Sequence, residues 1–71
     1  MNIEAHITGN VWKVLVKAGD SVAAGDQLII FESMKMEIPL EAEDPAKVVE
    51  VKVAEGQAVN EGDVVLVIQE S

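Results

Sequence analysis

One short segment of this sequence combines residue types that could take part in group transfer. Lys35 stands between Met34 and Met36, with Glu32 and Glu37 on either side of the trio. A lysine offers a flexible four-carbon stem that ends in an amine, and an enzyme that binds around the stem can acylate it. At neutral pH the amine is protonated, so a modifying enzyme has to supply the base that removes the proton. The chemistry that such a segment could support is attachment of a carried group.

The same lysine has a plainer interpretation. Lysines are mostly exposed, and methionines beside one can fold back onto the core because their side chains are long and adaptable. From the residues alone, a modified tether and an ordinary solvated lysine both remain open. Glu32 and Glu37 are open in the same way, since they could guide a docking enzyme by their charge or simply be solvated surface.

Two predicted strands must position this segment. Residues 27–33 and 36–41 are predicted to form a hairpin closed by a two-residue turn at Met34 and Lys35. The central residues of such a turn project into solvent, so Lys35 is expected at the tip. Pro39 has no backbone N–H and is expected to limit pairing in the second strand.

The rest of the sequence is a duplication. Residues 11–31 and 48–68 align without gaps at a spacing of 37 residues. Residues 12–17 and 49–53 alternate between apolar and polar side chains, which predicts a strand with one face toward the core. Trp12 is placed on that inward face, where a lone aromatic is expected to fill the core.

The remaining signals also indicate β structure, and no segment resembles a long helix. Residues 28–31 and 64–68 are continuously apolar and predict mostly buried strands. Strands paired between the two halves are expected to close a small sandwich with few free edges. Turns are predicted at Gly19-Asp20, Gly25-Asp26, Gly56-Gln57 and Gly62-Asp63.

Composition narrows the function classes. The chain has room for one compact domain, residues 1–71, and too little for an enzyme with its own enclosed pocket. Its net charge of −8 disfavours nucleic acid and anionic membranes as partners. His6 has no partner at a spacing typical of catalysis or metal binding. Without cysteines or a charged leader, we expect a soluble monomer in the cytoplasm.

A family resemblance adds specificity to the central segment. The run Glu32-Ser33-Met34-Lys35-Met36-Glu37 resembles the E-[AS]-M-K-M signature of the biotinyl domains of biotin-dependent carboxylases and decarboxylases. The two Gly-Asp half-repeats around a central lysine are similar to those of the biotinyl/lipoyl attachment domain family. This resemblance covers practically all 71 residues, and the length is similar to that of free-standing members of the family.

The resemblance implies a fold and a function. The fold would be all-β, a flattened eight-stranded barrel-sandwich hybrid with quasi-twofold symmetry. Lys35 would carry covalent biotin added by biotin protein ligase, and Met34 and Met36 would matter for carboxyl transfer or recognition. Glu32, Ser33 and Glu37 would contribute to partner recognition. The domain would catalyse nothing itself and would shuttle carboxylate between biotin carboxylase and carboxyltransferase subunits.

Two alternatives and two departures accompany this resemblance. The related lipoyl domains usually carry a trio such as Asp-Lys-Ala, so the flanking methionines favour biotin, with a lipoyl carrier or an unmodified interaction module as alternatives.

The family usually has glycine near the start of the second half-repeat, where this chain has Ala46 opposite Gly9. A different turn is therefore expected at residues 44–47. The chain also lacks the insertion that forms a protruding thumb in some acetyl-CoA carboxylase carriers.

Overall fold

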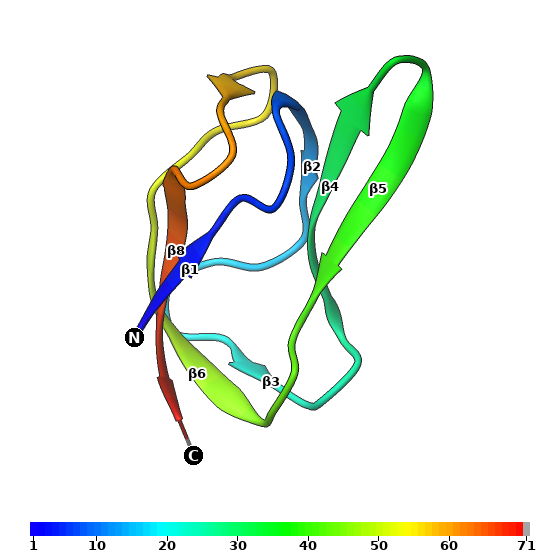
Figure 1. The fold of residues 1–71 in the computed structure, drawn as a ribbon. Helices are drawn as coiled ribbons and strands as arrows, with labels where there is room; N and C mark the ends of the chain where they lie inside the picture. The colour runs from blue at the N-terminus through cyan, green and yellow to red at the C-terminus, as the bar shows by residue number, and fades with distance from the viewer. Residues whose placement is uncertain (71) are drawn as a thin grey trace.

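The protein is an all-β sandwich in a computed structural model that describes residues 1–70 (Figure 1). Those residues form no helix, and so none that could cross a membrane. The strands are β1 (Asn2–Glu4), β2 (Gly9–Val14), β3 (Ser21–Val22), β4 (Gln27–Ser33), β5 (Met36–Glu41), β6 (Ala46–Val51), β7 (Ala58–Val59) and β8 (Val64–Glu70). The predicted fold class is confirmed.

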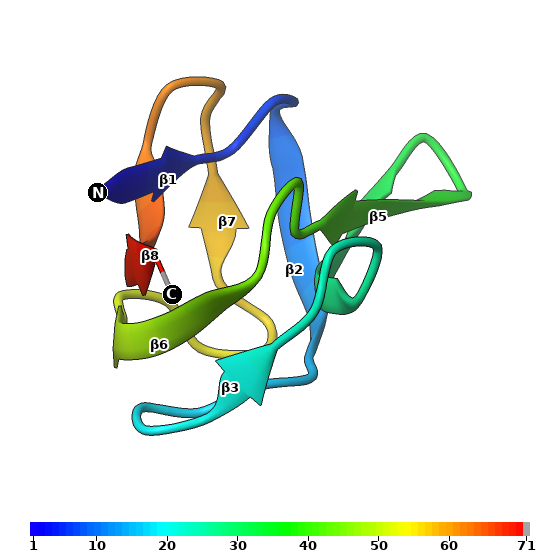
Figure 2. The same cartoon turned by 90° about the horizontal axis from the view of Figure 1, so that it is seen from below.

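Two four-stranded antiparallel sheets form the layers of the sandwich (Figure 2). Their strand orders are β1-β8-β6-β3 and β5-β4-β2-β7, so each sheet contains strands from both halves of the duplication. The sheets stay open, which corrects the expectation that pairing would close the sandwich. Three of the four edge strands are only two or three residues long, and short edges offer little to an unwanted partner strand. The long edge is β5, where Pro39 is tolerated because one side of an edge strand is unpaired.

Backbone hydrogen bonds between the halves make the quasi-twofold symmetry visible. In each half, two residues each exchange two hydrogen bonds with a glycine turn of the other half. Ala5 exchanges them with Gly62 and Asp63, Ala42 with Gly25 and Asp26, Val11 with Gly56 and Gln57, and Val48 with Gly19 and Asp20, at 2.7–2.9 Å. Every contact recurs 37 residues later in the chain or 37 earlier. The duplication inferred from the sequence is therefore confirmed as an interlocked structural repeat.

The four predicted turns share one local design. Each glycine has a φ of 89–99°, in the left-handed region that side chains disfavour. The residue after each glycine accepts a hydrogen bond through its side chain from the backbone N–H three residues earlier, which holds the turn closed. These acceptors are Asp20, Asp26, Gln57 and Asp63, at 2.8–3.1 Å.

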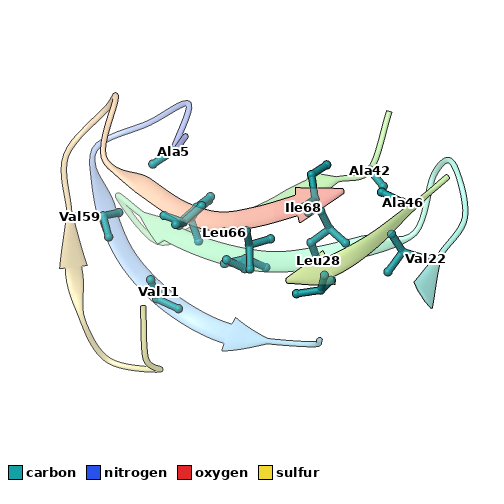
Figure 3. Packing of buried hydrophobic residues seen from close by; sticks show 13 residues of the cluster. Ala5, Val11, Val22, Leu28, Ala42, Ala46, Val59, Leu66 and Ile68 are labelled. Atoms are coloured by element: carbon teal, nitrogen blue, oxygen red, sulfur yellow. The ribbon is translucent and has the colours of Figure 1, made fainter. Parts of the chain in front are cut away.

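The core lies between the sheets and consists of apolar side chains from both (Figure 3). The predicted burial of residues 28–31 and 64–68 is confirmed, because each run contributes three fully or nearly fully buried residues and the rest are half-buried. Phe31 is the largest of them and is completely buried. No polar side chain is buried anywhere in residues 1–70.

The inward placement of Trp12 is wrong. Its side chain is 40% exposed, and its neighbour Val11 is buried instead. The cause is a β-bulge: the pairs Val11↔Phe31 and Lys13↔Ile30 advance two residues on β2 for one on β4, so Trp12 is the extra residue. A bulge resets the alternation of inward and outward side chains. A period-2 pattern read across it therefore assigns the wrong face.

The second half repeats this deviation. The pairs Val48↔Ile68 and Glu50↔Val67 again skip one residue, and that residue, Val49, is 51% exposed. Val48 is fully buried beside it. The bulge is thus a property of the repeated unit, and it explains why two adjacent valines have opposite environments.

Candidate functional site

The hairpin of β4 and β5 closes with a two-residue turn, as predicted. Ser33 pairs with Met36, which leaves Met34 and Lys35 as the turn itself. Their φ angles are 52° and 66°, and both are positive as a type I′ turn requires. Such turns match the twist of the flanking strands and usually contain Asn and Gly. This one contains two residues with long side chains.

That choice of residues costs folding energy. A residue with a Cβ in the left-handed region is disfavoured by about 1–2 kcal/mol, and among residues 1–70 Met34 and Lys35 are the two non-glycine residues with positive φ. Backbone strain of this kind concentrates at functional positions, where the side chain is needed in spite of its cost. The strain therefore marks the two turn residues as a candidate functional site.

The turn stands beyond the end of the sheet. The last pair between β2 and β4 toward the turn is Asn10↔Glu32. Past that point the hairpin continues without a neighbouring strand, through the pair Ser33↔Met36 to the tip (Figure 1). A partner protein can therefore approach the tip from several sides.

The side chains at the tip are exposed. Met34 is 92% exposed and Met36 63% exposed, so the alternative in which the methionines fold back onto the core does not hold for Met34. Lys35 is exposed as well. The ion pair found within residues 1–70 joins Lys52 to Glu50 at 3.2 Å, so no carboxylate holds the Lys35 ammonium in that part of the chain. The amine is free to meet an incoming reagent.

Two carboxylates sit one residue pair below the end of the hairpin. Glu32 and Glu37 are paired in register across β4 and β5, and both are exposed. They occupy the outer face, because the adjacent pair Phe31↔Ile38 points inward, with Phe31 buried and Ile38 half-buried. Ser33 is half-buried beside them. The site thus combines a cationic amine, exposed thioethers and a pair of negative charges.

Other parts of the described chain offer weaker candidate sites than the hairpin tip. No group of three or more His, Asp or Glu side chains in residues 1–70 is placed to hold a metal ion. His6 is exposed and lies edge-on to the ring of Phe31, with centroids 5.8 Å apart. An open groove of about 660 Å³ runs between Ile3, Leu40 and neighbouring residues, and none of residues 32–37 lines it. The hairpin tip is therefore the candidate site.

Sequence reasoning missed one residue that shapes this site. A Cβ built on Gly9 would lie 2.6 Å from the carbonyl oxygen of Glu32, so the start of β2 fits against the hairpin arm only without a side chain. The available signal is the mismatch with Ala46 in the duplication, from which the sequence predicts a change of turn and not a close approach of two strands. In the structure both residues begin a strand after a bend, so the order of elements is unchanged.

Nearly the whole chain is similar to known proteins that require or attach biotin. Residues 2–68 match the model of a family described as "Biotin-requiring enzyme". The chain is 51% identical to the biotin/lipoyl attachment protein of Bacillus subtilis, across all of this chain and 97% of that protein. It is 41% identical over 64 residues to the biotin carboxyl carrier protein of Streptococcus mutans, covering 90% of this chain and 49% of the carrier.

Solved structures agree with the sequence relatives. A single-chain, multi-domain long-chain acyl-CoA carboxylase contains a segment that is 37% identical and superposes with a TM-score of 0.96, covering all of this chain and 7% of that one. The lipoyl domain of the 2-oxoglutarate dehydrogenase complex from Azotobacter vinelandii superposes with a TM-score of 0.84 at 22% identity, over 99% of this chain and 96% of that domain. The second similarity concerns the fold alone.

Proposed function

The chain belongs to the biotin-requiring enzyme family and is a domain of the biotin carboxyl carrier type; on this premise we propose that biotin is attached to Lys35 through an amide bond. The observation that carries the proposal is the strained two-residue turn, which holds Lys35 exposed beyond the end of the sheet. A carrier needs little else from its scaffold, because the attached group supplies the chemistry.

The residues present suit a covalent tether. In the attachment step, a ligase-bound base takes a proton from the ammonium, Nζ forms a bond to the carbonyl carbon of an activated biotinyl ester, and the activating group leaves. The product is a neutral amide on a long, flexible stem. Because the charge is lost, the stem enters an apolar pocket of a partner at a lower desolvation cost. Met34 and Met36 offer that partner polarizable apolar contacts.

Biotin, when bound, would serve to hold a carboxyl group in transit between two active sites. We assign the donor and acceptor sites to biotin carboxylase and carboxyltransferase partners, with Glu32, Ser33 and Glu37 as the surface that those partners and the ligase contact. A tethered group meets its second partner at a high effective concentration, so transfer does not wait for free diffusion. The domain itself contributes presentation and positioning.

Expression with biotin ligase and biotin tests the attachment site. The wild-type chain is expected to gain the mass of one biotinyl group and to bind avidin on a blot, with the adduct mapped to Lys35 by peptide mass spectrometry. Lys35→Arg keeps the charge but is expected to stay unmodified, while Lys13, Lys17, Lys47 and Lys52 remain as internal controls. An adduct on any of those four lysines in the variant would reject the assignment.

A lipoyl carrier is the second candidate. It is favoured by one specific observation, since the relative from Bacillus subtilis, 51% identical to this chain, is described as a biotin/lipoyl attachment protein. The same mass measurement separates the two, because incubation with a lipoate ligase and lipoate would add a lipoyl mass without avidin binding. We place lipoate second because methionines flank the lysine on both sides.

A further inference from the structure

Gly9 differs from the other glycines of the chain because the neighbouring atoms leave no room for a side chain on it. The other four have φ of 89–99°, and a Cβ built on any of them would meet no atom within 4 Å; they are Gly19, Gly25, Gly56 and Gly62. Gly9 lies outside the left-handed region, so its backbone conformation does not itself require glycine. Its Cβ would instead lie 2.6 Å from the carbonyl oxygen of Glu32 and 3.2 Å from Cβ of Ser33. Space alone excludes a side chain here.

The crowded atoms belong to the arm that carries the turn. Glu32 and Ser33 are the last two residues of β4, and the hairpin leaves the sheet at this level. On its other side Gly9 pairs with Val59 of β7. Because β2 lies between β4 and β7, it cannot move away from the arm to admit a methyl group without being pushed against β7. An added side chain would displace the arm, two residues before Lys35.

The internal repeat provides a natural comparison. Ala46 is the counterpart of Gly9, begins β6, and pairs with Val22 of β3 and Glu70 of β8. Those partners are the counterparts of Val59 and Ser33, so the two sites have the same neighbours in the fold. At Ala46, however, a methyl group is accommodated and buried at 1% exposure. Only the half that carries the projecting hairpin requires the closer approach.

We propose that Gly9 is a positioning residue for the modification of Lys35, because it lets β2 rest on the backbone of Glu32 and Ser33 and so sets the direction in which the hairpin leaves the sheet. This inference rests on the proposed function. A ligase that binds the surface around the turn must bring its acyl donor to Nζ, so a displaced arm misplaces the nucleophile. A misplacement of about 1 Å can cost about 100-fold in rate.

Gly9→Ala tests the proposal with biotin ligase, biotin and the whole chain. The kcat/KM for biotinylation is expected to fall about 10- to 100-fold, while the amide NMR signals of Met34, Lys35 and Met36 shift and those of the distant sheet do not. Ala46→Gly is the matched control at the counterpart position. It removes a buried methyl group and lowers stability, but the folded protein is expected to be biotinylated at the wild-type rate.

A second variant keeps the test decisive if Gly9→Ala folds poorly. In the Gly9→Ala, Ser33→Gly double variant the Cβ that lies 3.2 Å away is absent. The loss of rate that Gly9→Ala causes in the Ser33→Gly background is therefore expected to be smaller than the loss that it causes in the wild-type chain. Unchanged biotinylation of a folded Gly9→Ala, or failure of both variants to fold, would overturn the positioning role. Absence of an adduct on the wild-type chain would instead reject the proposed function, so the two failures are distinguishable.

Discussion

Glu32 and Glu37 lie directly opposite each other on β4 and β5, one residue pair before the pair that closes the turn at Lys35. Like charges in opposed strand positions destabilise a sheet, yet both carboxylates remain exposed beside the amine. The hairpin thus holds two unfavourable features at once, a repulsive pair and a turn with side chains in the left-handed region. Both are understandable if the ligase and the carboxylase partners bind here, as proposed.

Neutralising one of these carboxylates should separate stability from recognition. Glu37→Gln is expected to raise the free energy of unfolding by about 0.2–1 kcal/mol, since it removes the cross-strand repulsion. Association with biotin ligase should become slower and less sensitive to salt, because charge steers encounters. Urea denaturation and ligase kinetics at two ionic strengths measure the two effects. Glu43→Gln, which lies in a bend outside the strands, is the control and should change neither.

Truncation of the tether should cost almost no stability. Lys35→Ala removes an exposed side chain at the turn, and substitutions of this kind usually stay within about 0.5 kcal/mol. The avidin-reactive adduct should disappear completely in the same variant. A large drop in the urea midpoint would show that the lysine packs against the domain, contrary to its exposed position.

The strain in the turn should be measurable. Met34→Gly is expected to raise the free energy of unfolding by up to about 1 kcal/mol, because glycine adopts positive φ without steric cost. Met36→Gly is the control: Met36 lies in β5 outside the positive-φ residues, so glycine there should destabilise the chain by about 0.5–1 kcal/mol. Equal destabilisation by both changes would show that the turn is unstrained.

The bulge in the second half makes a sharp prediction for two adjacent valines. Val48→Ala empties a fully buried position and should cost about 1–3 kcal/mol, whereas Val49→Ala acts at a half-exposed position and should cost less than about 0.5 kcal/mol. Alternation read from the sequence would have reversed this order. Thermal and urea unfolding of the two variants against wild type measure the difference directly.

These contrasts show which features the sequence could predict. The hairpin around Lys35 and the glycine turns depend on local chemistry, namely short apolar strands and residues that tolerate or require positive φ. The duplication depends on comparison of the chain with itself. All of these features, and a sandwich built from them, are predicted by the sequence itself.

The errors arose where a local pattern is modified by distant parts of the chain. The sequence places Trp12 in the core because the residues of its own strand do not indicate the β-bulge that β2 forms against β4. The sequence predicts strand pairing between the halves and hence closure of the sandwich, but it does not show that all such pairs fall within two separate sheets. The contact of Gly9 with Glu32 depends on the distance between two strands, which no periodicity in the sequence encodes.

The exchange of hydrogen bonds between the halves bears on how such a chain could have arisen. Every glycine turn of one half takes its partner from the other, at Ala5 and Ala42 and again at Val11 and Val48. A peptide of half this length would leave those backbone groups unpaired in isolation. It could satisfy them by associating with an identical copy, so a symmetric homodimer is the natural ancestor. Duplication and fusion of its gene would have joined the end of one copy, β4, to the start of the next, β5, and the turn at Met34 and Lys35 is that junction.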